Sequence, residues 1–260
     1  MTGPDRERFV VAVIGAGFGA LALAHRLAES GIDDLVIFER SDGVGGTWRA
    51  NTYPGAACDV PSHLYSLSFA PNPNWSRAYA VQAEILAYSE DCYDRFDIRR
   101  KVRCSTEIAA VDWDEARHLW RLRDAGGAEY EAAVVVSAVG LFHTPAIPPL
   151  PGLDTFGGTQ FHSARWDHGH DLAGRNVAVV GTGASAIQVV PAIAARVAHL
   201  DLYQRTPAWI VPRLDGPYTE EQKAQFAAEP AVARRHRDEL YQMFERNTGF
   251  LLGDPAVPVM

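Results

Sequence analysis

Short runs of apolar, often β-branched residues recur along the chain, and turn residues or stretches of helical periodicity separate them. Runs of this kind are typical of strands inside a parallel sheet. They occupy residues 11–14 (VAVI), 35–38 (LVIF), 134–136 (VVV), 177–180 (VAVV) and 200–204 (LDLYQ). Residues 82–96 instead show the spacing of an amphipathic helix, with core positions at Ile85, Leu86, Cys92, Tyr93 and Phe96. The pattern therefore predicts an α/β fold.

One of these runs is repeated together with the residues that follow it. Residues 11–20 (VAVIGAGFGA) and 177–186 (VAVVGTGASA) lie 177 − 11 = 166 positions apart, and both fit GxGxxA. In such a unit the first glycine permits a tight turn, and the second lets a pyrophosphate approach the backbone. The third small residue lets the helix pack against the strand. Because the helix N-terminus attracts anions, the repeat predicts two buried strands that each lead into a dinucleotide site.

The residue after the next strand distinguishes the two copies. Glu39 lies 39 − 15 = 24 positions after Gly15, where a carboxylate can accept hydrogen bonds from ribose hydroxyls. The alternative for Glu39 is a solvated carboxylate at a strand end. Arg205 and Thr206 take the corresponding place in the second copy, where a guanidinium suits a 2′-phosphate. We therefore expect FAD or NAD at the first copy and NADP at the second.

The segments outside the repeat differ in character. Residues 111–113 and 119–122 read as short strands, after which residues 134–136 return as a buried strand to the first sheet. A proline-rich stretch at residues 145–151 predicts a domain boundary. Residues 215–246 are charged and helical in propensity, without a further strand–helix–strand signal.

Composition excludes several classes of protein. The 260 residues are 47% hydrophobic and 22% charged, which fits a globular protein of one large or two modest domains. The formal net charge of −8 disfavours nucleic acid as a partner, because binding to its backbone needs a basic face. Three cysteines without a CxxC motif speak against a zinc knuckle, a dithiol centre and hence a disulfide reductase. We expect no metal site.

One uncharged stretch resembles a secretory signal only superficially. Residues 9–24 follow Arg6 and Arg8, but they are shorter than the ~20 apolar residues of a membrane span. They also contain Gly15, Gly17 and Gly19, which suit a phosphate-binding turn. We therefore expect a cytoplasmic protein without a membrane partner.

Two longer patterns carry a resemblance to a known family. Residues 45–59 (GGTWRANTYPGAACD) fit GGxWxxxx[FY]PGxxxD, and residues 156–167 (FGGTQFHSARWD) fit FxGxxxHxxxW[PD]. With the two GxGxxA turns in order, the sequence resembles the Baeyer–Villiger monooxygenases, which are similar to the broader flavin-containing monooxygenases. The resemblance covers the chain from about Phe9 to Pro212.

The resemblance implies an enzyme that uses FAD and NADPH. In the family, NADPH reduces the flavin, and the reduced flavin forms a C4a-peroxide with O2. This species attacks a ketone and yields an ester or lactone, so the partners would be O2 and a ketone or related small molecule. Residues 1–145 would form the N-terminal part of the FAD-binding domain, 146–210 the linker and first βαβ unit of the NADP-binding domain, and 211–260 the start of a helical insertion.

The resemblance also implies site residues, position by position. Asp59 would lie near the flavin–nicotinamide junction and tune a catalytic arginine, whereas the neighbouring Cys58 reads as an inert buried thiol. His162 would couple domain motion to turnover, while Trp48 and Trp166 suit core packing as well as stacking. The expected cofactor-binding residues are Gly15, Gly17, Phe18, Glu39, Thr47, Trp48, Asp59 and Tyr65 for FAD, and Thr182, Gly183, Ser185, Gln188, Arg205 and Thr206 for NADPH.

The family's catalytic arginine has no counterpart within these 260 residues. The resemblance therefore implies an N-terminal portion with both nucleotide-binding domains incomplete. Such a chain would be inactive alone and would have a complementary C-terminal half as a partner. Two alternatives stay open: a flavin-containing N- or S-oxygenase, and a non-catalytic nucleotide-binding fragment or half of a split enzyme.

Overall fold

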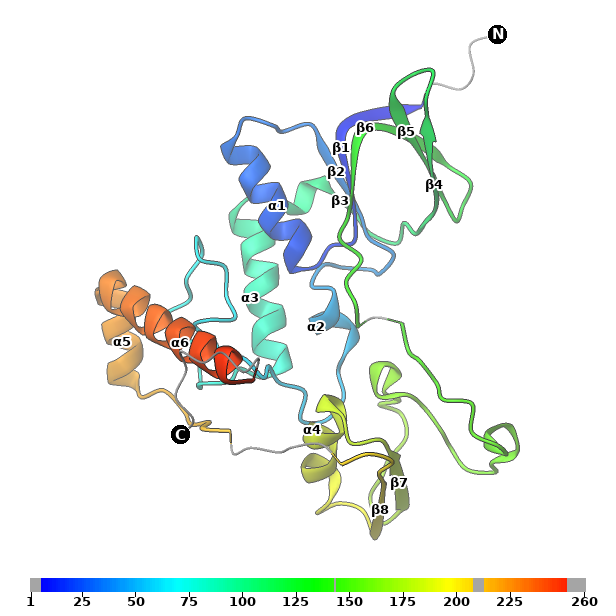
Figure 1. The fold of residues 1–260 in the computed structure, drawn as a ribbon, viewed down its shortest axis with the longest axis vertical. Helices are drawn as coiled ribbons and strands as arrows, with labels where there is room; N and C mark the ends of the chain where they lie inside the picture. The colour runs from blue at the N-terminus through cyan, green and yellow to red at the C-terminus, as the bar shows by residue number, and fades with distance from the viewer. Residues whose placement is uncertain (1–5, 143, 208–212, 252–260) are drawn as a thin grey trace. The chain divides into compact units, whose positions relative to one another are not determined.

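The computed structural model describes residues 6–142, 144–207 and 213–251 (Figure 1). It divides into two units, residues 1–53 with 85–171 and residues 54–84 with 172–260. Each unit contains one copy of the repeat, and the predicted α/β class is confirmed. Within the described ranges, no helix combines the length and apolar character that a membrane crossing requires.

In the described part of the first unit, six strands form one sheet in the order β3-β2-β1-β6-β5-β4. The strand β1 pairs in parallel with β2 and β6, whereas β4, β5 and β6 pair antiparallel. The elements are β1 (Glu7–Ile14), α1 (Phe18–Glu29), β2 (Leu35–Phe38), α2 (Thr47–Ala50), α3 (Gln82–Arg95), β3 (Val102–Arg103), β4 (Ile108–Asp114), β5 (Leu119–Asp124) and β6 (Glu129–Ser137).

The first repeat forms the buried centre of this unit. In β1, Ala12 and Val13 are fully buried, and all four residues of β2 are buried as well. The helices α1 and α3 pack together through the rings of Phe18 and Tyr88, whose centroids lie 6.0 Å apart. The predicted core positions of α3 are confirmed as buried or half-buried, and Tyr88 and Ser89 are buried in addition.

In the described part of the second unit, the second repeat forms a parallel pair of strands (Figure 1). Its elements, and the two helices that follow, are β7 (Asn176–Val180), α4 (Ala184–Ile193), β8 (His199–Tyr203), α5 (Glu220–Ala228) and α6 (Pro230–Leu251). The α4 side chains of Val189 and Ile193 are buried. The expectation of a helical segment after residue 215 is confirmed by α5 and α6.

Two predicted strands are less buried than expected. Val180 at the end of β7 is 61% exposed, because β8 is the strand that pairs with β7 in the described part of the chain. Val134 in β6 is 47% exposed, since the pairing between β5 and β6 ends at Ala132 and leaves one edge of β6 open beyond it. The prediction of buried strands is therefore wrong for β7 and for the second half of β6.

Three segments that are distant in sequence pair side by side in the second unit. The segment that follows residue 55 pairs with residues 76–82, and these pair with residues 213–219. The backbone hydrogen bonds run from Cys58 N–H to Ala80 O (3.0 Å), from Ala78 N–H to Gly216 O (2.9 Å) and from Tyr218 N–H to Ser76 O (3.0 Å). This pairing connects the end of the first fingerprint to the segment that leads into α5.

The helices α5 and α6 contact the same region through aromatic rings. The helix α5 begins with a capping box between Thr219 and Gln222. His63, which is 4% exposed, lies with its ring centroid 4.6 Å from that of Phe226 and 5.1 Å from that of His236. A histidine in this setting has to stay neutral, because its charge would be buried among rings.

We predict that His63 makes the second unit sensitive to acid. Burial lowers the pKa of His63 from 6.5 to about 4, and His236 and Arg237 act in the same direction. Between these values the unfolded chain binds a proton that the folded chain does not, so stability falls as the pH is lowered. The expected loss from pH 7 to 4.5 is on the order of 2 kcal/mol in urea unfolding.

His63→Phe should reduce the change of unfolding free energy with pH, because phenylalanine keeps a ring and removes the titrating group. Phe226→Leu is the matched control, since it weakens the same packing at every pH and leaves the slope intact. An unchanged slope in His63→Phe would contradict the assignment.

Candidate nucleotide-binding sites

The two copies of the repeat have the same turn geometry. Gly15 has φ of +99° and Gly181 has φ of +106°, a region in which side chains other than glycine are strained. The N–H of Gly15 donates to Phe38 O over 2.8 Å, and that of Gly181 donates to Tyr203 O over 2.9 Å. In both copies, therefore, the turn is bonded to the last residue of the neighbouring parallel strand.

Both turns lead directly into a helix that can receive an anion. The N-cap residues are Gly17 for α1 and Gly183 for α4, both with extended backbone and without a capping side chain. Neither helix has an acidic residue in its first turn. The first N–H groups of a helix have no partner within it, so each N-terminus offers donors and partial positive charge at the carboxyl edge of its strands.

The first turn is tightly enclosed by backbone. A Cβ on Gly15 would lie 2.6 Å from Ala138 O, and a Cβ on Gly46 would lie 3.0 Å from the Cα of Gly17. Gly45 N–H also donates to Ala16 O over 2.9 Å. Gly46 is thus required because the fingerprint loop packs against the first turn, whereas a Cβ on Gly45 would lie 2.3 Å from the Leu86 side chain.

Glu39 lies beside the first turn, as the sequence predicts. Its side chain is buried, and its carboxylate accepts hydrogen bonds from Ala16 N–H (2.7 Å) and Ser41 N–H (2.8 Å). The solvated alternative is therefore wrong for this residue. A carboxylate has about four acceptor positions, so two bonds leave capacity for a ribose hydroxyl.

Three further predicted FAD residues surround the same turn. Phe18 begins α1, and its ring stacks on that of Tyr88 at an interplanar angle of 28°. Thr47 and Trp48 begin the short helix α2; Thr47 is half-buried, and Trp48 is 8% exposed. The burial of Trp48 favours core packing over a stacking platform.

One contact to this turn was missed by the sequence analysis. The hydroxyl of Tyr93, a fully buried residue of α3, donates to Gly17 O over 3.0 Å. Burial raises the pKa of Tyr93 above its ordinary range, which keeps the hydroxyl protonated as a donor. A tyrosine at a core position of an amphipathic helix is the available signal, because a buried hydroxyl requires a partner.

The second turn is more open than the first. A Cβ on Gly181 or on Gly183 would have no neighbouring atom within 4 Å. Thr182 and Ser185 are half-buried, and Gln204 Nε2 lies 3.5 Å from Thr182 Oγ1. Arg205 and Thr206 are exposed directly after β8, at the edge where the second turn lies.

Gln188 makes a specific contact with the first fingerprint. Its side-chain amide donates to Ala57 O (2.9 Å) and accepts from Ala57 N–H (3.3 Å). Gly55 permits this approach, since a Cβ there would lie 2.5 Å from Gln188 O. In this structure Gln188 therefore binds the 54–59 segment, and its contact with NADPH stays a prediction.

Asp59 and Tyr65 belong to the second unit, whereas Thr47 and Trp48 belong to the first. Asp59 is exposed and Tyr65 is half-buried. The neighbouring Cys58 is 2% exposed, and burial raises its pKa to about 11. The predicted burial of Cys58 is confirmed, and its inertness stays a prediction.

The second fingerprint has structural roles in the first unit. His162 Nδ1 accepts a hydrogen bond from Ala164 N–H (3.0 Å) and caps the 3-10 helix Ser163–Arg165. The ring of Trp166 packs on that of Phe161 at 5.1 Å between centroids. Both residues thus shape a turn, and the coupling role of His162 stays a prediction.

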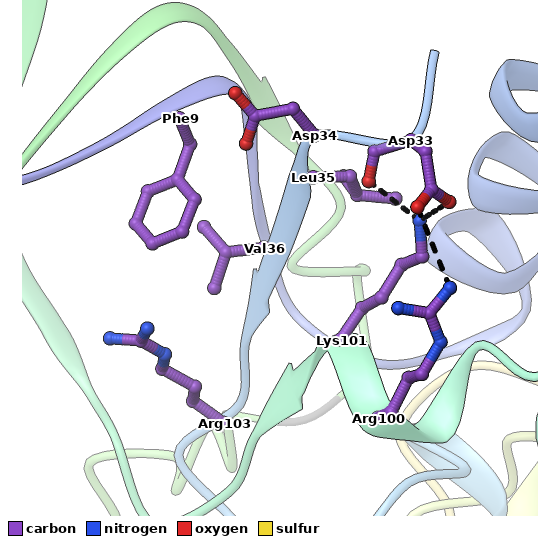
Figure 2. Close-up of a pocket in the computed structure, with 8 residues that line it drawn as sticks. All are labelled: Phe9, Asp33, Asp34, Leu35, Val36, Arg100, Lys101 and Arg103. Carbon is purple, nitrogen blue, oxygen red and sulfur yellow. Dashed lines mark hydrogen bonds and ion pairs between the residues drawn. The ribbon is translucent and has the colours of Figure 1, made fainter. Parts of the chain in front are cut away.

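A pocket of about 200 Å³ lies elsewhere in the first unit (Figure 2). It is found where β2 begins, and the side chain of Lys101 projects into it and bonds to Asp33. Because dinucleotides bind at the carboxyl ends of parallel strands, a pocket at the amino end is not the candidate site.

Comparison with known proteins agrees with this geometry. A family described as "NAD(P)-binding Rossmann-like domain" matches residues 13–81, and one described as "L-lysine 6-monooxygenase/L-ornithine 5-monooxygenase" matches residues 69–236. A Baeyer–Villiger monooxygenase of Pseudomonas aeruginosa is 52% identical over 95% of the chain and 46% of its own length. The chain spans about half the length of the curated relatives it matches.

Solved structures show the same fold. Cyclohexanone monooxygenase from Rhodococcus bound to NADP⁺ has a TM-score of 0.80 at 41% identity, over 88% of this chain and 44% of that one. The OTEMO complex with FAD and NADP has a TM-score of 0.77 at 30% identity, over 85% of this chain and 44% of that one.

The unequal enclosure of the turns predicts unequal tolerance to a methyl group. Gly15→Ala combines a positive φ with a backbone clash and should lower the free energy of unfolding by about 3 kcal/mol or more. Gly181→Ala carries only the positive φ and should cost about 1–2 kcal/mol. Urea unfolding followed by circular dichroism measures both; equal losses would contradict the enclosure of the first turn.

Proposed function

We propose that this chain uses FAD and NADPH to insert one oxygen atom of O2 next to the carbonyl of a ketone. The chain belongs to the monooxygenase family described as "L-lysine 6-monooxygenase/L-ornithine 5-monooxygenase". The observation that carries the proposal is the duplicated glycine turn, whose two copies have residues of opposite charge after the neighbouring strand. These residues are Glu39 in the first copy and Arg205 in the second. The relatives named for Baeyer–Villiger and cyclohexanone chemistry support a ketone substrate.

The first turn fits the diphosphate and ribose of FAD. At Gly15 and Gly46 a Cβ would meet backbone atoms, so the turn and the fingerprint loop pack closely. Gly17 and Gly19 place no side chain at the start of α1, so backbone groups would contact a pyrophosphate there. The α1 N-terminus would face the phosphates, and Glu39 would accept from the ribose. Bound there, FAD would supply the chemistry of oxygen activation, and the protein would bind, orient and exclude water.

The second turn fits NADPH. Gly183 leaves open space at the N-terminus of α4, and Arg205 is exposed after β8, where a 2′-phosphate would need a cation. Thr182, Ser185 and Thr206 would add hydroxyl donors. Asp59 and Tyr65 are further candidates for contact with the flavin, and Asp59 would tune a catalytic arginine that the complementary C-terminal half would have to supply.

Location and further partners follow from the same observations. Cys58, Cys92 and Cys104 are free thiols, which supports a reducing cytoplasm. Within the described residues, one edge of β7 and one edge of β6 beyond Ala132 have no paired strand. These edges, and relatives about twice as long, support a complementary C-terminal half as a partner.

A second candidate is oxygenation at nitrogen or sulfur. The family description that names lysine and ornithine monooxygenases favours it, because both of these amino acids carry a side-chain amine. The third candidate, a nucleotide-binding fragment without turnover, would keep both cofactor sites and lack product formation.

Product analysis separates the three candidates. The protein is incubated with FAD, NADPH and cyclohexanone or methyl phenyl sulfide, alone and mixed with the C-terminal half of the Pseudomonas relative. We expect lactone in the mixture and little with the chain alone. Sulfoxide without lactone would favour the second candidate. Cofactor binding without product in either sample would favour the third candidate.

Arg205→Ala should narrow the preference for NADPH over NADH by about tenfold or more, because it removes a charge-assisted bond to the 2′-phosphate. The measurement is the ratio of NADP⁺ and NAD⁺ dissociation constants. Arg175→Ala is the matched control, since Arg175 is an exposed arginine next to the amino end of β7. Unchanged selectivity in Arg205→Ala would refute the role.

A further inference from the structure

One arginine of α6 reaches back to the loop that follows the first fingerprint. Arg237 Nη1 lies 2.5 Å from His63 O, 3.0 Å from Leu64 O and 3.0 Å from Ser66 O, and 3.3 Å from Ser66 Oγ. These partners are 171 to 174 positions away in sequence. All four contacts are made by Nη1, whose two N–H groups are shared among these acceptors, and Ser66 Oγ also donates to His63 O over 2.9 Å. The guanidinium therefore joins three carbonyls of one loop.

A second arginine binds the same loop at its other end. Arg213 Nη1 donates to Cys58 O over 3.3 Å, and its guanidinium lies 5.1 Å from the ring centroid of Tyr79. Arg213 is itself paired with Asp215, with 3.3 Å between Nη2 and Oδ2. Residues 58–66, called the 58–66 loop below, are therefore held by arginines at both ends.

Between these two points the loop is fixed by aromatic packing. The ring of His63 contacts those of Tyr218, Phe226 and His236, and the Tyr218 hydroxyl lies 3.1 Å from His236 Nε2. His236 and Arg237 are adjacent on α6, so one turn of this helix supplies both the ring and the guanidinium. The loop between the held ends carries Asp59 and Tyr65.

We propose that Arg237 is a positioning residue: it fixes the conformation of the 58–66 loop, which carries Asp59 and Tyr65, the two residues that the proposed function assigns to FAD. The inference rests on the proposed function, in which these two residues act at FAD. The part of the inference that concerns the loop alone does not rest on that function, because Arg237 fixes the 58–66 loop whether or not the cofactor is bound.

The part of the inference that concerns the loop alone is tested by hydrogen exchange of the whole chain without cofactor. Arg237→Ala should raise the exchange rates of amides in the 58–66 loop about tenfold or more, because their carbonyl anchors are lost. Arg234→Ala, an exposed arginine one turn earlier on α6, should leave them unchanged. Unchanged exchange in Arg237→Ala would overturn the proposal.

The link to the cofactor is tested by FAD titration of the same variants. Arg237→Ala should raise the dissociation constant of FAD about tenfold. Arg237→Lys should have an intermediate dissociation constant, because lysine keeps the charge and N–H donors but lacks the planar guanidinium. Thr219→Ala is the structural control, since it removes the α5 cap and lowers stability without touching the loop. An equal loss of FAD affinity in Thr219→Ala would overturn the positioning role.

The two experiments fail separately. If the parent protein binds no FAD, the proposed function fails while hydrogen exchange still decides whether Arg237 fixes the loop. If the parent binds FAD and Arg237→Ala binds it equally well, the positioning role fails and the proposed function stands.

Discussion

The structure depends on one backbone constraint, the close approach of a glycine turn to the end of the neighbouring strand. In each copy of the repeat, a glycine with positive φ donates its N–H to the last carbonyl of the adjacent parallel strand. The next residues begin a helix whose N-terminus consequently lies at the carboxyl edge of the strands. The phosphate contacts expected of this protein are arranged around that edge.

The two turns differ in how closely other atoms surround them. The first is enclosed by Ala138 and by the paired glycines of the fingerprint, and a buried carboxylate is bonded to its backbone. Such a site suits a cofactor that is held permanently. The second turn has open space at its helix N-terminus, and the exposed side chains of Arg205 and Thr206 lie at the same edge of the strands. A site of this kind suits a nucleotide that binds and leaves during turnover.

Much of this was predictable from local patterns. The runs of β1 and β2, the helix α3 and the helical character of residues 215–246 follow from periodicity, because each depends on neighbours within about ten residues. The candidate site residues Gly15, Glu39 and Gly183 follow from spacing. The pattern also places Gly46 and Gly55, but it does not say that they admit the backbones of Gly17 and Gln188.

Contacts between distant residues could not be predicted in the same way. The hydroxyl of Tyr93 on Gly17 and the guanidinium of Arg237 on the 58–66 loop join segments up to 174 positions apart. The exposure of β7 likewise depends on which strands pair with it, and this is not a property of its own sequence.

The central claim is that the two turns hold two different nucleotides. Calorimetric titration of one sample, first with FAD and then with NADP⁺, tests it most directly. The account predicts one site for each ligand, with NADP⁺ still binding after FAD has reached saturation. Displacement of FAD by NADP⁺, or failure of either ligand to bind, would contradict it.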